Sequence, residues 1–176
     1  MNIRIFIAVF ISCLCSYNVS AEPACSFKNT EHRRISGDNP DDFQCIKLLA
    51  AEGDEHWQYY LGLILTGHVS GEKNIHEGLT LLNKIALSQS KYNAQAMRFL
   101  GETYKKLNSP YQNNELAYQW FYLASQQPYF KGGSLLPDEQ LTKAISSQRM
   151  KALEISAPKL LQSLTRHSSG TPNGAP

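Results

Sequence analysis

The sequence lacks the motifs on which most enzymes depend. Neither the G-x-S-x-G pattern of serine hydrolases nor the H-E-x-x-H pattern of zinc proteases occurs, and no glycine-rich segment has the spacing and order of a phosphate-binding loop. The five histidines are scattered, and none accompanies a Ser or Cys nucleophile motif. Adjacent carboxylates such as Asp54 and Glu55 stand where a helix begins, and the helix dipole accounts for them there. We therefore expect no catalytic residue and no enzymatic activity.

The chain also lacks a large excess of charge and the close ligand pairs of a metal site. Its 17 basic and 15 acidic residues give a formal net charge of +2, which provides no bulk attraction for nucleic acid or an anionic membrane. Structural zinc sites use close Cys or His pairs, and neither C-x-x-C nor H-x-x-x-H occurs. We therefore expect no metal, no cofactor and no nucleic-acid partner.

No apolar run is long enough to cross a membrane. Arg4 precedes an almost wholly apolar stretch over 5–14, but polar residues at 16–18 interrupt it before the roughly 20 apolar residues that a membrane span needs. Small residues up to Ala21 fit a signal-peptidase site. We therefore expect a signal peptide over 1–21, a periplasmic mature chain and no stable membrane insertion after cleavage.

The four cysteines divide by position. Cys13 and Cys15 lie in the leader, whereas Cys25 and Cys45 remain in the mature chain. Two cysteines in an oxidising compartment predict one disulfide, which contributes about 3 kcal/mol in the chain-entropy model. A lipid anchor on Cys13 is a weaker alternative to cleavage, because Phe10 is a poor residue at the start of a lipoprotein box. Secretion is also a less favoured alternative to periplasmic retention.

Beyond the leader, apolar residues recur at helical spacing in segments that Gly, Asn, Asp and Pro separate. The first segment follows acidic residues that suit a helix N-terminus and ends near Gly53. The pattern predicts helices over residues 41–53, 54–67, 74–88, 92–107 and 113–127. Short loops between the later helices predict antiparallel hairpins.

A capping helix is predicted over 137–166, because proline in its first turn and neighbouring acidic residues favour a helix start. Pro158 is predicted to bend or end this helix. Residues 168–176 are rich in Ser, Gly, Pro and Thr, which predicts a disordered tail.

Four aromatic residues lie around the end of the second predicted hairpin: Phe121, Tyr122, Tyr129 and Phe130. We interpret them as core and capping contacts, with a peptide-binding patch as the alternative.

The two predicted hairpins repeat each other without a gap. Sliding the sequence by 39 residues brings Leu61 onto Leu100, Gly62 onto Gly101, Gly78 onto Ala117 and Leu81 onto Trp120. The small residues in this register are predicted to let the two helices of each hairpin approach closely, while bulkier neighbours fill the space beside them.

The segments YYLGLILTG and RFLGETYKKL, followed by EGLTLLNKIA and LAYQWFYLAS, carry this register. They resemble the Sel1-like repeat, a TPR-like hairpin with a Leu-Gly pair in its first helix and an Ala-x-x-Trp-x-x-x-Ala pattern in its second. The resemblance covers residues 41 to about 156. The second repeat matches through Gly101, Ala117 and Trp120, whereas the first has Gly78 and Leu81 in place of the alanine and the tryptophan.

The resemblance implies an all-α fold, a short right-handed α-solenoid of antiparallel helical hairpins with an N-terminal half-repeat and a C-terminal capping helix. The expected organisation is a signal peptide over 1–21, a disulfide-tethered segment over 22–40, a repeat domain over 41–167 with repeats at about 54–91 and 92–130 and a cap at 137–166, and a tail over 168–176.

Members of this family act as partner-binding modules, and the repeat itself needs no cofactor. The resemblance therefore implies a periplasmic protein-binding module. Its most specific version is an immunity protein that neutralises a toxic secreted effector by direct binding. The alternative is a scaffold or assembly factor of an envelope machine, such as a motor, a secretion apparatus or a cell-wall complex.

The first helix of each repeat usually lines the binding face of such arrays. We expect a partner to contact the residues of these helices that are not committed to packing around the Leu-Gly pairs: His56, Tyr59, Leu63 and Thr66, with Gln95, Arg98, Glu102 and Lys105. Tyr59 and Arg98 are the strongest candidates, because exposed aromatic rings and guanidinium groups dominate interface energetics. The alternative interpretation is a solvated face without a partner.

Overall fold

The computed structural model describes Cys25 and residues 37–128 and 139–169. These residues form seven α-helices and no strand, so the predicted all-α class is confirmed for the described part of the chain. The helices are α1 (Pro40–Ala51), α2 (Glu55–Leu65), α3 (Ile75–Leu87), α4 (Asn93–Lys105), α5 (Asn114–Ser125), α6 (Glu139–Ala144) and α7 (Ser147–Ser169).

Four of these helices begin directly after an Asn or Asp residue that separates two apolar segments of the sequence. The side chains of Asn39, Asp54, Asn74 and Asn113 accept hydrogen bonds from backbone N–H groups in the first turns of α1, α2, α3 and α5. The first turn of a helix leaves such donors without a partner, and each cap contributes about 1 kcal/mol. These caps explain why the predicted starts lie within a residue or two of the observed ones.

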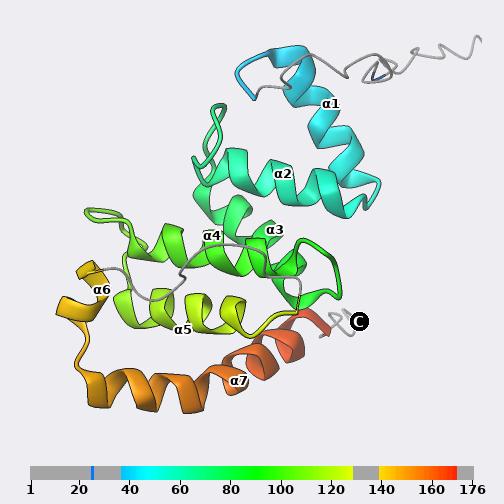
Figure 1. The fold of residues 1–176 in the computed structure, drawn as a ribbon. Helices are drawn as coiled ribbons and strands as arrows, with labels where there is room; N and C mark the ends of the chain where they lie inside the picture. The colour runs from blue at the N-terminus through cyan, green and yellow to red at the C-terminus, as the bar shows by residue number, and fades with distance from the viewer. Residues whose placement is uncertain (1–24, 26–36, 129–138, 170–176) are drawn as a thin grey trace, which may run out of the picture.

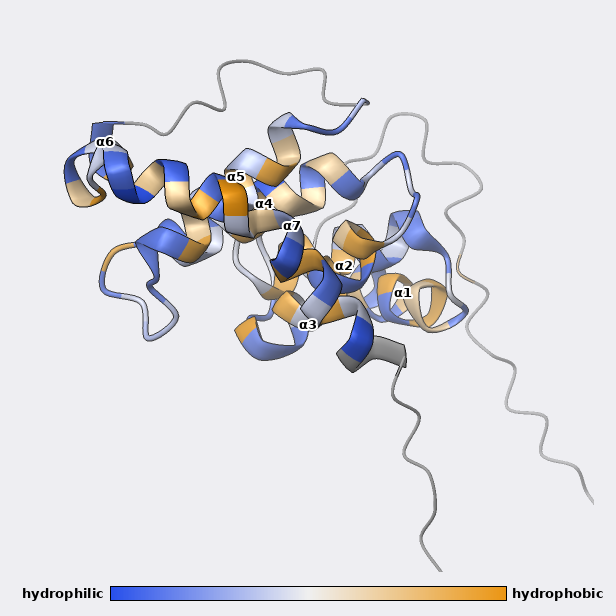
Figure 2. Cartoon of the chain, turned by 90° about the horizontal axis from the view of Figure 1, so that it is seen from below, coloured by the Kyte–Doolittle hydropathy of each residue, from blue (hydrophilic) through white to orange (hydrophobic). Residues whose placement is uncertain are grey.

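Each helix from α1 to α5 packs against the next one along the chain, and α7 packs along α5 and reaches α3 (Figure 1). The short loops within the pairs α2–α3 and α4–α5 make each of them a hairpin. In Figure 2 the helices carry both hydrophobic and hydrophilic residues, as expected for helices that bury one side and expose another.

The main core lies between α3, α4 and α5, and the C-terminal half of α7 closes it. Trp120 is its largest fully buried side chain, with 1% of its surface exposed, and Leu82, Leu100 and Ala157 lie in the same cluster. A second cluster, around Ile46 and Ile64, joins α1 to α2. The two clusters hold successive helices together without a central sheet.

Glycines allow the close approach that the register predicts. A Cβ atom added at Gly101 would lie 2.8 Å from the ring of Phe121 on α5, and one added at Gly62 would lie 3.0 Å from Leu82 on α3. At Gly78 the nearest atoms include the backbone nitrogen of Thr66 at 2.9 Å. Real Cβ atoms almost never come closer than 3.0 Å, so a side chain at Gly78 or Gly101 would force its neighbours to move, and Gly62 lies at the edge of this limit.

We predict that Gly78→Ala lowers the free energy of unfolding by about 1–2 kcal/mol, since overpacking costs about 1–3 kcal/mol and the better helix propensity of alanine returns part of it. Gly62→Ala should cost less, because the added methyl meets the flexible end of Leu82 instead of backbone. Urea denaturation of both variants checks this order, and an equal loss would contradict the difference in packing.

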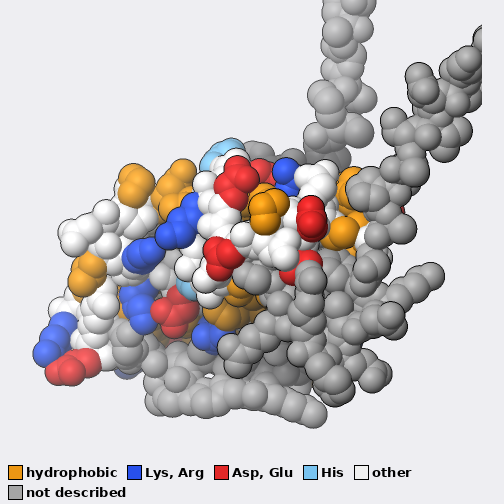
Figure 3. Space-filling model, turned by 90° about the horizontal axis from the view of Figure 1, so that it is seen from above, with side chains coloured by type: hydrophobic (Ala, Val, Ile, Leu, Met, Phe, Trp, Pro, Cys, Tyr) orange, Lys and Arg blue, Asp and Glu red, His pale blue; other side chains and the backbone are white. Residues whose placement is uncertain are grey.

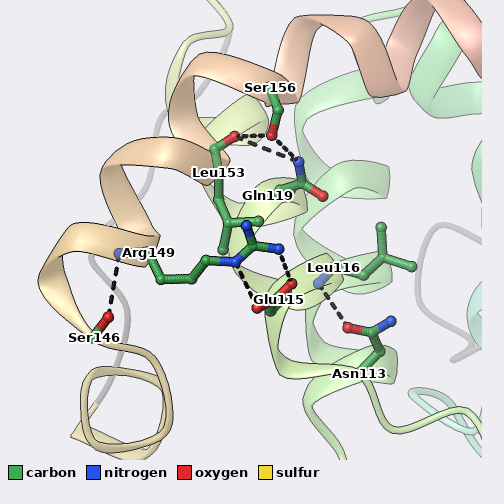
Figure 4. A network of polar contacts seen from close by, with 8 residues as sticks. All are labelled: Asn113, Glu115, Leu116, Gln119, Ser146, Arg149, Leu153 and Ser156. Atoms are coloured by element: carbon green, nitrogen blue, oxygen red, sulfur yellow. Dashed lines mark hydrogen bonds and ion pairs between the residues drawn. The ribbon is translucent and has the colours of Figure 1, made fainter.

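A polar seam joins α5 to α7 (Figure 4). Arg149 on α7 donates two hydrogen bonds to the carboxylate of Glu115, at 2.7 and 2.6 Å. Gln119 donates to the hydroxyl of Ser156 at 2.9 Å, and the Tyr118 hydroxyl donates to Glu154 at 2.6 Å. The Arg149 pair is exposed, and exposed pairs contribute little stability.

Two predictions about the C-terminal helix are wrong. The predicted single cap consists of the short α6 and the long α7, and α7 runs to Ser169, so the helix includes the first residues of the predicted tail. Of the two effects predicted for Pro158, it does not end the helix, because α7 continues through it. Proline removes one backbone donor, but Leu160, Leu161 and Leu164 beyond it pack on the main core. Burial of these side chains favours continuation of the helix past the proline.

Several predictions lie outside the described residues. They concern the signal peptide over 1–21, most of the segment over 22–40, the aromatic residues Tyr129 and Phe130, and residues 170–176 of the tail. Of the two other aromatic residues in the predicted cluster, Phe121 is buried and Tyr122 packs against the main core, as predicted.

Candidate functional site

Five aromatic rings form a continuous row where α2 meets α4. His56 and Tyr59 come from α2, and His68 comes from the loop that follows it. Tyr92 directly precedes α4, and Phe99 lies further along α4. His56 is exposed and the other four are half-buried. We call these five residues the aromatic row.

The rings contact one another in sequence. Tyr59 and Tyr92 stack with centroids 5.2 Å apart and planes inclined by 13°. His56 lies 5.4 Å from Tyr92 at one end, Tyr59 lies 6.3 Å from Phe99, and Phe99 lies 4.8 Å from His68 at the other end. Aromatic pairs at 4.5–7 Å attract one another, so each ring holds its neighbour in place.

Cations lie over two rings of the row. The Arg98 guanidinium carbon lies 4.0 Å from the centroid of Phe99, and the Lys91 ammonium lies 5.1 Å from that of Tyr92. Such contacts stabilise by about 0.5–1 kcal/mol at exposed sites. The Arg98 guanidinium is thereby held beside the aromatic row, where it can pair with an incoming carboxylate.

Six of the eight predicted contact residues are at least partly accessible. His56 and Tyr59 belong to the aromatic row, and Arg98 lies against it. Gln95, Glu102 and Lys105 are half-buried on α4. Lys105 forms an ion pair with Glu102 at 3.0 Å, so these two side chains partly neutralise each other.

The other two predicted contact residues, Leu63 and Thr66, lie in the interior. Leu63 is 6% exposed and belongs to the main core, and Thr66 is 5% exposed. The Thr66 hydroxyl donates to the carbonyl of Gly62 at 2.7 Å, one turn earlier in α2. The expectation that these residues are free of packing is therefore wrong, because α2 is covered by α1 on one side and by the main core on another.

Burial changes the ionisation of two residues in the row. It raises the pKa of the Tyr59 phenol to about 12, and the nearby Arg98 opposes this rise in part. Tyr59 is thus a neutral hydrogen-bonding group at physiological pH. Burial also lowers the pKa of His68, whose Nε2 lies 2.9 Å from the hydroxyl oxygen of Thr103. The lowered pKa favours the neutral form of His68.

The lowered pKa of His68 predicts a pH dependence of stability. The unfolded chain takes up a proton near pH 6.5 that the folded chain resists, so the free energy of unfolding should fall as the pH drops through about 6.5. Denaturation between about pH 7.5 and 5.5 measures this slope. His68→Gln should flatten it, whereas His76→Gln, at an exposed position on α3, should leave it unchanged. An unchanged slope in His68→Gln would contradict the assignment.

Three residues of the row were missed from the sequence: His68, Tyr92 and Phe99. His68 follows the predicted helix over 54–67, and Tyr92 is the first residue of the predicted helix over 92–107 but was not assigned to its binding face. Phe99 aligns by 39 residues with Tyr60, which packs toward α1. A search for aromatic residues around each predicted helix start, rather than along one helical stripe, would have found Tyr92.

Among the residues that the structure describes, no three or more His, Cys, Asp or Glu side chains cluster closely enough to hold a metal ion. In the same ranges, no helix has both the length and the apolar character needed to cross a membrane. No family model, no curated protein and no solved structure matches this chain.

Proposed function

We propose that this chain is a protein-binding module and that the aromatic row, together with Arg98, is its contact surface. The observation that carries the proposal is the stack of Tyr59 on Tyr92 beside the Arg98 guanidinium on Phe99, all of it half-exposed. Tyr and Arg are the residues most enriched at binding hot spots. Ring contacts already fix their positions, so little side-chain freedom is lost on binding.

The hairpins provide a rigid support for this surface. We propose that α2–α3 and α4–α5 are two Sel1-like repeats of a short solenoid, with α1 as a half-repeat and α7 as the cap. The packing of successive helices and the close contacts at Gly62 and Gly101 support this arrangement. In such an array a partner meets side chains from two adjacent repeats, as it would in the aromatic row.

We further propose that the mature chain works in the periplasm and that its partner is a toxic secreted effector, which the chain neutralises by direct binding. The leader pattern and the cysteine pair support the compartment, and the absence of catalytic motifs from the sequence supports binding over chemistry. An effector whose contact region carries carboxylates would complement Arg98 and Lys91.

Site-specific photo-crosslinking tests the surface in cells. A benzophenone amino acid at position 56, within the row, should yield one adduct of defined mass, and the same group at position 84, an exposed position on α3, should not. Arg98→Ala should weaken the position 56 adduct. Equal adducts from both positions, or none from position 56, would contradict the proposal.

A further inference from the structure

A pocket of about 250 Å³ lies between α1 and α3, with α2 as its floor. It is separate from the aromatic row, and none of its lining residues belongs to that row. Its lining residues are Phe43, Lys47, Ala50, Ala51, Leu61, Leu65, Glu72, Glu77 and Leu81. Ligand pockets for small molecules usually measure about 300–1,000 Å³, so this α1–α3 pocket has a size suited to a single large side chain.

The floor of the pocket is apolar and already ordered. Phe43, Leu61 and Leu65 are 8%, 5% and 3% exposed and belong to the cluster that joins α1 to α2. Leu81, on α3, is half-buried at the wall of the pocket. An apolar group that entered would therefore displace water from a surface that needs no rearrangement.

The repeat register explains why the pocket is open. Leu81 aligns with Trp120, which is 1% exposed and fills the core between α4 and α5. The smaller leucine leaves space at the corresponding place in the first hairpin. The first hairpin thus lacks the indole group that closes the second.

The rim of the pocket is acidic on one side. Glu72 and Glu77, both exposed, come from the α2–α3 loop and from α3, and Lys47 comes from α1 on the other side. The Lys47 ammonium lies 5.1 Å from the centroid of the Phe43 ring, which holds it at the apolar wall. Figure 3, which looks onto the α1 end of the molecule, shows acidic side chains around exposed hydrophobic ones. An incoming basic group would meet two carboxylates.

We propose that the α1–α3 pocket is a second docking site, which takes one bulky apolar side chain of a partner protein that is flanked by Lys or Arg. The apolar side chain contacts Leu65 and Leu81, and the basic group pairs with Glu72 and Glu77. The site is separate from the aromatic row, so an experiment can contradict one of the two proposed surfaces without contradicting the other.

Short capped peptides test this proposal on the whole protein. The probes are acetyl-Gly-Phe-Lys-Lys-Gly-amide, the same peptide with Glu-Glu in place of Lys-Lys, and the same peptide with Ala in place of Phe. Methyl and amide NMR spectra report the pocket through Ala51, Leu65 and Leu81. We expect saturable shifts with the first probe and binding about threefold or more weaker with each of the other two.

Two protein variants sharpen the test. Leu81→Trp should fill the pocket and abolish the shifts at Ala51 and Leu65. The pair Glu72→Gln with Glu77→Gln keeps the side-chain size and should remove the preference for Lys-Lys over Glu-Glu, which keeps the test valid if the tryptophan variant does not fold. Glu52→Gln, at an exposed position in the α1–α2 turn, is the matched control and should change nothing.

Three outcomes would overturn the proposal. The first is the absence of saturable shifts with the Phe-Lys-Lys probe. The second is equal affinity for all three probes. The third is a change at Ala51 and Leu65 on dilution without peptide, which would show that a second copy of this chain fills the pocket.

Discussion

Trp120→Ala should lower the free energy of unfolding by about 3–5 kcal/mol, the usual cost of truncating a buried tryptophan. Trp120 is 1% exposed and contacts a cluster to which α3, α4, α5 and α7 all contribute. Its removal would leave a cavity where these helices meet. Because these helices pack on one another, the side chains around the cavity have little freedom to move into it.

Trp57→Ala is the matched control for this prediction. Trp57 is half-buried at the edge of the α1–α2 cluster, so its truncation should cost clearly less. Urea denaturation monitored by circular dichroism measures both variants. A loss at Trp120 no larger than the loss at Trp57 would contradict the placement of the indole at the centre of the molecule.

Oxidation of Cys25 and Cys45 should raise the free energy of unfolding by about 2–4 kcal/mol. The structure holds both as free thiols, so the predicted disulfide is not present in it. The two side chains nevertheless share a hydrogen bond, which is the main reason that the pKa of the Cys45 thiol is raised to about 11. A disulfide reagent that takes up two electrons and two protons, and is itself reduced to two thiols, would join the sulfur atoms.

The raised pKa also affects how the disulfide forms. Little of Cys45 is thiolate at neutral pH, and the thiolate is the reactive species, so Cys45 itself should react slowly with an oxidant when no thiol catalyst is present. Denaturation of the oxidised and reduced proteins, with the Cys25→Ser and Cys45→Ser double variant as control, measures the effect. Equal stability of the oxidised and reduced forms would contradict it.

The helices could be predicted because residues at their own ends determine where they begin and stop. Asn and Asp caps begin α1, α2, α3 and α5, and Gly53 and Gly67 follow α1 and α2 with positive φ angles of 95° and 79°. Backbone of this kind strongly favours glycine. The close helix contacts were also predictable, because the register aligns small residues with one another.

The face of α2 could not be predicted in the same way. Leu61, Ile64 and Leu65 pack toward α1, whereas Leu63 packs into the main core. A helix with neighbours on two sides is apolar around most of its circumference, so its sequence does not mark one exposed stripe. The assignment of Leu63 and Thr66 to a binding face failed for this reason.

The course of the C-terminal helix depended on distant residues as well. Local propensity favours a break at Pro158, but the leucines beyond it reach a core built by α3, α4 and α5. The aromatic row likewise combines residues from two helices, a loop and a helix cap. Contacts of this kind follow from the tertiary arrangement, which neither periodicity nor capping encodes.

The most direct test of the proposed binding surface is the dissociation constant of the partner that the position 56 crosslink identifies. Calorimetric titration should show binding about 30-fold weaker for Tyr59→Ala and for Arg98→Ala, which corresponds to about 2 kcal/mol for each hot spot. Lys84→Ala, at the exposed control position, should bind like the parent. Affinities within twofold of the parent for both Tyr59→Ala and Arg98→Ala, with their folds intact, would contradict the proposal that the aromatic row holds the partner.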